Sequence, residues 1–288
     1  MARELLLMRQ GAAKRHAAEG GLHSKAKRRA QRMGIWLAQN HLIPDRIICT
    51  PNPCAIVTTT KMAKAMAFNV RNIIVDNHIT ETLAQQPESV ERILILADQC
   101  ELEPLMTTEE QLLPGDLLLL DRQGRVKRHI AAKSLPKEFP YPDIDNSELR
   151  PRPAYYYHQS AVIPYRIVDD GVMIMLITSS GGRHWVVPKG IHEPGLTAAD
   201  SACKEAWEEA GIIGTITKKP LGIYHYTKWK SDCRVTVFAM QVTKLEESWQ
   251  ESHRKRRWCQ ADEAISLIHQ PALIPMIRQL ITQLTEER

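Results

Sequence analysis

Three glutamates in the second half of the chain have the spacing of groups that act together. Glu205, Glu208 and Glu209 stand at i, i+3 and i+4, so a helix over about 197–210 places their carboxylates on one face. Like charges at this spacing repel one another, and the helix dipole disfavours anions near the carboxyl end. A divalent cation relieves the repulsion, because Mg²⁺ prefers oxygen ligands and leaves room for substrate phosphates. The spacing therefore predicts a metal site suited to phosphate chemistry.

The flanking residues predict both ends of this helix. Thr197, with Asp200 three residues later, resembles a capping box and marks the start. Gly211 is expected to end the helix as the residue just beyond its last turn. Taken alone, "EAWEEAG" is equally compatible with a solvated helix end that binds nothing, so that alternative stays open at this point.

The stretch "PKGIHEPGLTAADSACKEAWEEAGI", residues 188–212, resembles the Nudix box. That pattern is a glycine, five residues, a glutamate, seven residues, then Arg-Glu-(aliphatic)-x-Glu-Glu-x-Gly-(aliphatic). The strict matches are Gly190, Glu205, Glu208, Glu209, Gly211 and Ile212. Lys204 replaces the arginine, Ala206 replaces the aliphatic residue, and Leu196 replaces the first glutamate.

The resemblance implies an α+β Nudix hydrolase domain with a mixed sheet over 155–288, in the branch that cleaves diphosphoinositol polyphosphates and dinucleoside polyphosphates. It implies Mg²⁺ as cofactor, with Mn²⁺ as a substitute. Glu205 and Glu209 match the principal metal ligands, and Glu208 matches a ligand or the residue that orients or deprotonates water. The box positions Gly190, Lys204 and Gly211 are structural in this comparison. The general base stays unassigned, because it varies among Nudix subfamilies.

Basic residues near the box are expected to contact a small anionic polyphosphate. Arg183 and Lys189 flank the box loop, and Arg254 and Arg257 bound the run "RKRR". A solvated turn is the alternative for that run. The net charge of +5 fits an anionic substrate, and no extended basic surface with interleaved aromatic residues indicates a nucleic-acid partner.

Leu196 is the main departure from the pattern. Because the box glutamate mostly supports its arginine, losing both reads as the paired loss of one salt bridge, which spares the site. The competing interpretation is weakened catalysis. The whole chain would then be a non-catalytic phosphometabolite-binding or regulatory protein with both of its sites degenerate.

The first half, residues 1–138, has the pattern of an α/β domain with a doubly wound, mainly parallel sheet. Short apolar runs alternate with helix-period stretches at about 24–40, 52–67 and 103–112. The expected strands are "ELLLM", "RIICT", "NIIVD", "RILILA" and "DLLLLD". This order resembles the histidine phosphatase superfamily, in its short phosphohistidine-phosphatase branch, whose first strand leads to Leu-x-Arg-His.

Three positions depart from that family's catalytic pattern. Arg9 and Gly11 are present, but Gln10 stands where the phosphorylated histidine belongs. Cys54 takes the place of a second arginine, and Asp98 that of a second histidine. Glutamine cannot form the phosphoenzyme, so we expect a catalytically silent domain that binds a ligand, packs on its neighbour or mediates self-association, for example in a homodimer.

The remaining features concern the seam and the setting of the protein. Residues 139–154 carry four prolines and are expected to form an extended linker. The six cysteines are scattered, without a C-x-x-C pair, as in reduced proteins. No apolar run reaches the length of a membrane span, and the start lacks a signal-peptide pattern. A cytoplasmic location is therefore expected.

Overall fold

The computed structural model describes residues 3–13, 21–106, 111–141, 144–145, 148–169 and 171–286. The chain divides into two compact units, Met1–Pro153 and Ala154–Arg288. Each unit has hydrophobic clusters of its own, so each is described by itself. None of the helices in these described ranges is long and apolar enough to cross a membrane.

The first unit is built on a six-stranded sheet of order β3-β2-β4-β1-β5-β6. β3, β2, β4 and β1 are parallel, β5 runs antiparallel to β1, and β6 is antiparallel to β5. The central strands consist of Leu and Ile runs buried on both faces, as expected for a sheet covered by helices on each side. The bounds are β1 Glu4–Arg9, β2 Arg46–Cys49, β3 Ile73–Val75, β4 Arg92–Ala97, β5 Leu117–Leu120 and β6 Val126–Ile130.

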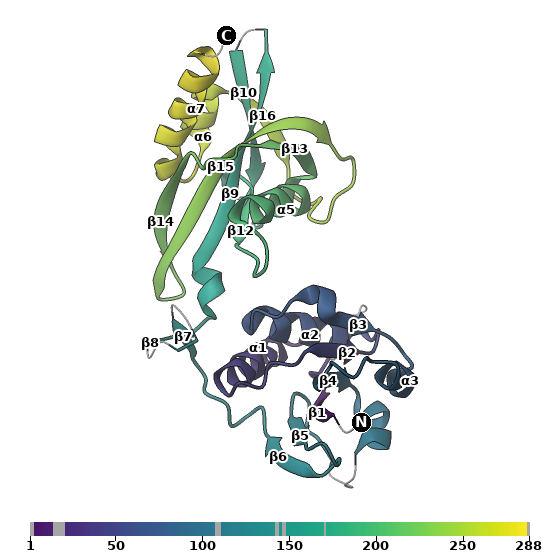
Figure 1. The fold of residues 1–288 in the computed structure, drawn as a ribbon. Helices are drawn as coiled ribbons and strands as arrows, with labels where there is room; N and C mark the ends of the chain where they lie inside the picture. The colour runs from purple at the N-terminus through teal and green to yellow at the C-terminus, as the bar shows by residue number, and fades with distance from the viewer. Residues whose placement is uncertain are drawn as a thin grey trace. The chain divides into compact units, whose positions relative to one another are not determined.

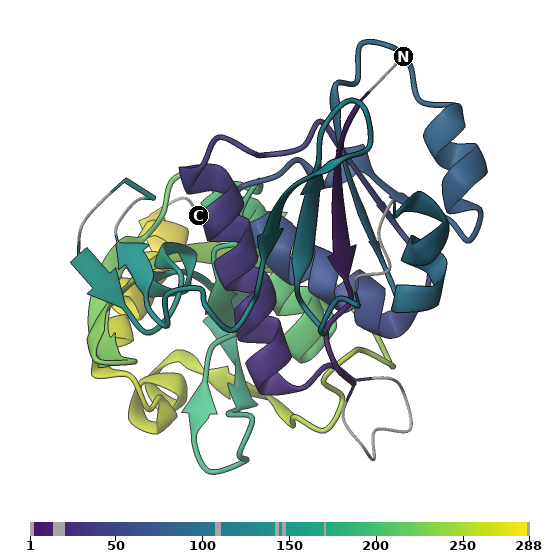
Figure 2. The ribbon, with the colours of Figure 1, turned by 90° about the horizontal axis from the view of Figure 1, so that it is seen from below.

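Helices cover both faces of this sheet (Figure 2). One face packs on α1 (Ser24–Gln39) and α2 (Pro53–Ala65), and the other on α3 (Ile79–Ala84) and α4 (Gln99–Leu102). Short 3₁₀ turns, η1 (Val70–Asn72) and η2 (Glu103–Leu105), complete the unit. The helix expected at 103–112 differs: its described part is η2 and irregular chain, because Pro104 favours a short turn, while 107–110 lie outside the described residues.

The proline-rich segment expected to be a linker contains a hairpin. β7 (Phe139–Tyr141) pairs with β8 (Glu148–Arg150). The Phe139 side chain is buried against Ile35 and Ala65 of the first unit. Prolines are compatible with such short edge strands, and one buried aromatic ring is enough to fix the segment. The hairpin therefore belongs to the first unit, and the division follows Pro153.

The second unit contains an eight-stranded mixed sheet of order β11-β10-β9-β15-β13, with β12 paired to β9, β14 to β15 and β16 to β10. β9 and β15 are parallel and the other pairs are antiparallel. The bounds are β9 His158–Val168, β10 Gly171–Thr178, β11 Trp185–Val186, β12 Lys189–Ile191, β13 Ile212–Ile216, β14 Gly222–Lys228, β15 Ser231–Leu245 and β16 Arg256–Gln260. The predicted combination of mixed sheet and helices is confirmed.

Three helices lie on this sheet (Figure 1). α5 (Ala198–Ala210) covers one face, and α6 (Ala261–Leu267) with α7 (Ile274–Glu286) covers the other. Short turns η3 (Ala154–Tyr157) and η4 (Pro271–Leu273) precede β9 and α7. Because side chains alternate along a strand, β9 sends Val162 toward α5, and Ala161 and Ile163 toward α7. The sheet thus holds α5 directly over β9 and β12.

Candidate active site

The ends of α5 follow from the residues that the sequence places there. Thr197 is the N-cap, and its Oγ1 accepts the Asp200 N–H at 3.1 Å. Gly211 ends the helix with φ of 60°, a left-handed conformation in which glycine is unstrained. Ala202, Ala206 and Ala210, all 0% exposed, let the helix pack closely on the sheet. Both predicted ends are present in the structure.

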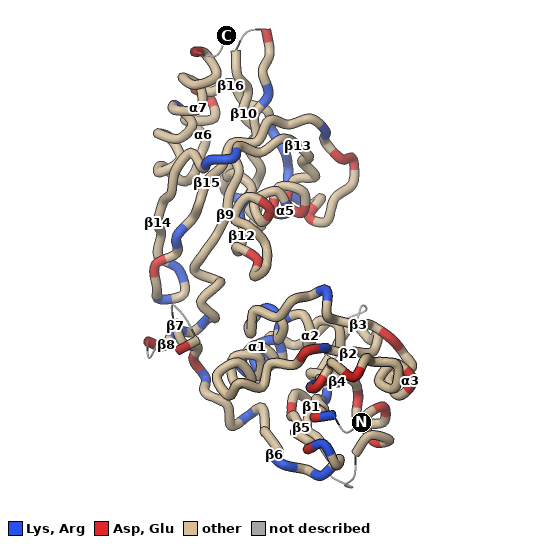
Figure 3. The backbone as a smooth tube through the Cα atoms, in the orientation of Figure 1, with Lys and Arg blue, Asp and Glu red and all other residues tan. Residues whose placement is uncertain are grey.

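Acidic residues line α5 (Figure 3), and two of its glutamates dock the helix on β12. The Glu205 carboxylate lies against Gly190, where an added Cβ would stand 2.1 Å from it. Glu209 Oε2 accepts the Lys189 N–H at 3.0 Å. Any side chain at position 190 would displace Glu205, so the glycine is a steric requirement of the site.

The electrostatics of this face favour a cation. Burial, followed by repulsion from Glu209 and Glu208, raises the pKa of Glu205 to about 7. Burial also raises the pKa of Glu209 to about 7, against the opposing influence of Arg254. A bound cation would lower both pKa values by stabilising the ionised carboxylates.

A hard divalent ion fits the chemistry of these three oxygen donors and the crowding at Glu205. Across the described ranges, however, no group of three or more His, Cys, Asp and Glu side chains already has the arrangement of a metal site. A single Mg²⁺ ion held by all three glutamates would require their side chains to move closer together.

Arg254 helps to hold the Glu209 side chain in its present position. Its side chain is 8% exposed and donates to Glu209 Oε1 at 2.6 Å and to Glu251 Oε2 at 2.7 Å. It also donates to the Thr178 carbonyl at 3.3 Å. This placement differs from the expected contact with substrate: Arg254 is a buried partner of the acidic face. Glu251 was not anticipated from the sequence, because nothing local ties it to α5.

Lys189 is joined to the acidic face by its backbone N–H, which Glu209 accepts. Its Nζ donates to Gln159 Oε1 at 2.8 Å and to the Tyr226 hydroxyl at 3.1 Å. Burial and then Lys228 lower the pKa of Lys189 to about 8, although Glu209 opposes the shift. Gln159 and Tyr226 were not predicted, since they come from β9 and β14 and meet Lys189 only through the sheet.

Arg183 and Arg257 lie apart from that network. Arg183 is exposed in the loop between β10 and β11. Arg257 pairs with Glu263, and its guanidinium lies 5.9 Å from the centre of the Trp185 ring. Within the basic run, Arg256 instead donates to the Ala210 carbonyl at 3.0 Å and caps the end of α5.

The sequence suggested that a salt bridge is lost at Leu196 and Lys204, but Lys204 forms ion pairs in the structure. Lys204 Nζ lies 3.3 Å from Glu193 Oε1 and 3.1 Å from Glu208 Oε1. Burial acts to lower the pKa of Lys204, yet Glu193 and then Glu208 raise it overall. An ion pair is therefore present, formed with a carboxylate three residues before Leu196.

Comparison with known proteins identifies a family for this part of the chain. The model described as "NUDIX domain" matches residues 157–280. Nudix hydrolase 12, mitochondrial, of Arabidopsis thaliana is 32% identical over 151 residues, covering 45% of this chain and 74% of that protein. The chain belongs to the Nudix family. The prediction of a Nudix pyrophosphohydrolase is confirmed at this level, and residues 154–288 are called the Nudix unit below.

Other similar proteins carry more specific names. The diphosphoinositol polyphosphate phosphohydrolase 3-alpha of Mus musculus is 28% identical over 133 residues, covering 44% of this chain and 80% of its own. A solved Ap4A hydrolase binary complex from C. elegans is 22% identical, with a TM-score of 0.39, covering 45% of this chain and 98% of that one. The phosphohistidine phosphatase SixA structure from Agrobacterium tumefaciens is 17% identical, with a TM-score of 0.41, covering 46% and 99%.

In the first unit, Arg9, Gln10 and Asp98 lie at the carboxyl ends of β1 and β4. Arg9 Nε lies 3.2 Å from Asp98 Oδ1, and Arg9 Nη1 donates to the Leu112 carbonyl at 2.7 Å. Gln10 follows β1, and its Oε1 is buried without a hydrogen-bond partner in the described chain. Cys54 is 5% exposed at the start of α2. Asp98, just beyond β4, thus pairs with the Arg9 guanidinium.

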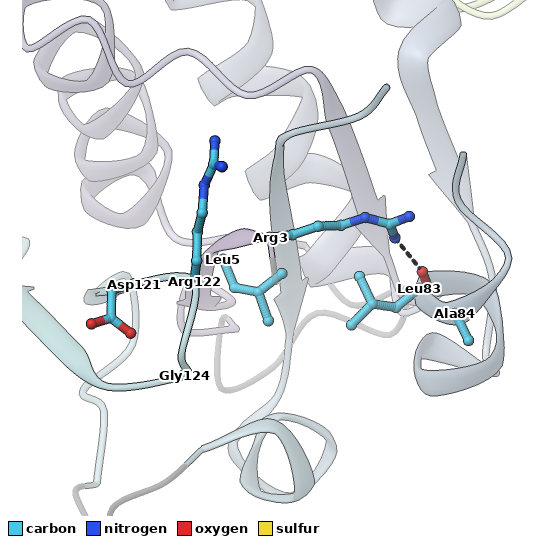
Figure 4. Close-up of a pocket in the computed structure, with 7 residues that line it drawn as sticks. All are labelled: Arg3, Leu5, Leu83, Ala84, Asp121, Arg122 and Gly124. Carbon is cyan, nitrogen blue, oxygen red and sulfur yellow. Dashed lines mark hydrogen bonds between the residues drawn. The ribbon is translucent and has the colours of Figure 1, made fainter. Parts of the chain in front are cut away.

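A pocket of about 350 Å³ lies at the opposite end of β1 (Figure 4). Arg3 points along it and donates to the Leu83 carbonyl at 2.8 Å. Asp121 accepts from the Arg125 Nε at 2.9 Å. These charged groups already have partners, and the residues that line the pocket do not include Gln10.

Proposed function

We propose that the Nudix unit hydrolyses a phosphoanhydride bond of a small polyphosphorylated substrate with Mg²⁺, for which Mn²⁺ can substitute. The substrate class is a dinucleoside polyphosphate or a diphosphoinositol polyphosphate, as the names of the relatives suggest. The observation that carries the proposal is the acidic face of α5, where Glu205 and Glu209 are held with raised pKa values beside Glu208.

Glu205, Glu208 and Glu209 would hold the metal ion. When bound, the ion would neutralise phosphate oxygens and acidify the attacking water. Glu209 is positioned for this by the Lys189 N–H and by Arg254, and Glu208 by Lys204. The rigid helix thus keeps the three carboxylates on one face, where side-chain rotation can bring them to a common ion.

Lys189 would bind the polyphosphate. Its ammonium lies among Gln159, Tyr226 and the acidic face, so a phosphate group beside the metal ion would also meet this cation. The exposed side chain of Arg183 and the half-exposed one of Arg257 are proposed as outer contacts for a longer polyphosphate chain. Arg254 would act through Glu209 instead of touching substrate.

The decisive experiment is turnover with and without metal. We expect the full-length protein to release phosphate or nucleotide from diadenosine polyphosphates or diphosphoinositol polyphosphates only with Mg²⁺ or Mn²⁺. Glu209→Gln should lower kcat by about 100-fold or more, because groups that only support metal ligands already contribute roughly 10–100-fold.

Glu286→Gln is the matched control, since Glu286 is exposed at the end of α7. It should leave kcat unchanged. Equal turnover by the wild type and Glu209→Gln at every metal concentration would refute hydrolysis at this site. No turnover by either protein would favour the binding-only alternative, which has no use for ionised glutamates on α5.

The first unit is proposed to be catalytically silent. Gln10 lacks a nucleophilic nitrogen, and Asp98 holds the Arg9 guanidinium and adds negative charge beside it. Both effects oppose the capture of a phosphoryl group. A binding or docking role is compatible with this edge, because the fold does not require the chemistry.

A further inference from the structure

The loop between β12 and α5 contains Leu196, where the chain departs from the Nudix box. Lys204, a second departure, lies on α5 itself. Leu196 is 42% exposed, so it makes no buried substitute for the missing carboxylate. Glu193 is far less exposed, at 16%, and its Oε1 lies 3.3 Å from Lys204 Nζ. A carboxylate thus reaches the basic residue from a different position in the sequence.

A tight turn brings the Glu193 side chain close to the position that the box glutamate would occupy. Residues 193–196 read Glu-Pro-Gly-Leu, and the Leu196 N–H donates to the Glu193 carbonyl at 3.1 Å. Gly195 has φ of +88°, and Pro194 precedes it, which is the signature of a type II turn. In such a turn the first and fourth Cα atoms lie within about 7 Å of each other. A glutamate at the first position can therefore replace one at the fourth.

The backbone of Glu193 is also fixed on α5. Its N–H donates to Ser201 Oγ at 3.0 Å, and Ser201 is 0% exposed. Lys204 therefore stands between two anchored carboxylates, Glu193 and Glu208. A freely solvated surface pair would have neither the buried anchor nor the second carboxylate.

We propose that Glu193 is a positioning residue of the Nudix site, which takes over the role of the box glutamate and orients Glu208 through Lys204. The inference rests on the proposed hydrolase function. It explains how the site keeps its ion pair although the residue at position 196 is leucine. The carboxylate that pairs with Lys204 comes from position 193, at the start of the turn, instead of position 196 at its end.

The test combines removal with relocation. Glu193→Gln should lower kcat by about 10–100-fold, the usual cost of losing a group behind a metal ligand, and leave KM within about twofold. Adding Leu196→Glu in the same chain should restore kcat to within about threefold of wild type, because the turn brings position 196 close to position 193. A residue needed only for folding would not be rescued by moving its carboxylate.

Mn²⁺ binding provides a readout without substrate. In electron paramagnetic resonance titrations of the full-length protein, Glu193→Gln should bind Mn²⁺ more weakly, and the double variant should recover. Glu91→Gln is the control, because it breaks an exposed ion pair with Arg122 in the first unit. It should match wild type in both measurements.

The outcomes separate this inference from the function on which it rests. A wild-type protein without metal-dependent turnover would refute the proposed function. An active wild type whose Glu193→Gln variant keeps full kcat and Mn²⁺ affinity would overturn the positioning role alone. So would a Glu193→Gln defect that Leu196→Glu fails to repair in a double variant with wild-type thermal stability.

Discussion

Burial is the largest cause of the pKa shifts of two charged residues at the site, Lys189 and Glu205. Lys189 illustrates this: its pKa is lowered to about 8, chiefly by burial and next by Lys228. Its ammonium is therefore present below pH 8 and lost as the pH rises through that value. Glu205 is shifted in the other direction, since burial and neighbouring carboxylates raise its pKa to about 7. Both groups change charge near neutral pH.

The Lys189 shift predicts a pH limit on substrate binding. KM for the polyphosphate should rise above pH 8, because the neutral amine no longer attracts phosphate. Lys228→Gln should move that rise to higher pH by removing a nearby positive charge. Lys189→Arg should abolish it, since a guanidinium stays protonated. Initial rates between pH 6 and 10 would check this, and a KM profile that neither variant moves would contradict it.

The Glu205 shift predicts a pH effect on stability without metal. Because the folded-state pKa lies above the usual 4.5, folding favours the protonated form. Stability from this group is complete below pH 4.5 and is lost as the pH rises through about 7. Urea denaturation of metal-free protein should show a smaller loss over this range for Glu205→Gln than for wild type. Identical slopes would contradict the raised pKa.

At the scale of elements, the contact between α5 and β12 decides whether the site can form. Gly190→Ala would place a Cβ 2.1 Å from the Glu205 carboxylate. Because the clashing atoms are the end of a flexible side chain, we expect the carboxylate to move aside with little change in the free energy of unfolding, and most turnover to be lost because a proposed metal ligand is displaced. Gly181→Ala is the matched control, because its nearest neighbour, Arg183 Nε, is 3.9 Å away. Turnover equal to the control would show that the position of Glu205 does not depend on Gly190.

The elements also show which features a sequence can reveal. The ends of α5 are local properties of Thr197 and Gly211, so they were predictable from the sequence. The Glu193–Lys204 pair was not, because it depends on a turn that changes which carboxylate faces the helix. The burial of Arg254 also could not be foreseen, since its partner Glu209 is distant in sequence. Short β6 and β12 lack the apolar runs by which strands are recognised.

For the whole molecule, the division into two units is the main feature. The hydrophobic clusters do not mix residues from the two sides of Pro153, so each unit buries its own core. Residues 154–288 alone should therefore keep metal-dependent hydrolysis within a few-fold of the full chain. Residues 1–153 alone should show no phosphatase activity on phosphohistidine or p-nitrophenyl phosphate.

The measurement needs both fragments folded, which circular dichroism would establish. Loss of hydrolysis from a folded 154–288 fragment would mean that the first unit contributes to catalysis. Phosphatase turnover by a 1–153 fragment purified free of contaminating enzymes would overturn the silent assignment. A Gln10→Ala version is the control, because a true activity at that edge should respond to it.

The parallel pairing of β9 with β15 has a consequence for how the protein is made. His158 faces Arg234 across this pair, so α5 is synthesised well before its supporting sheet can close. Contacts between segments so distant in the chain form late, because the intervening loop must first be ordered. The acidic helix therefore leaves the ribosome without Arg254, its later partner. A nascent chain should remain inert toward polyphosphates until the segment that carries Arg254 has emerged.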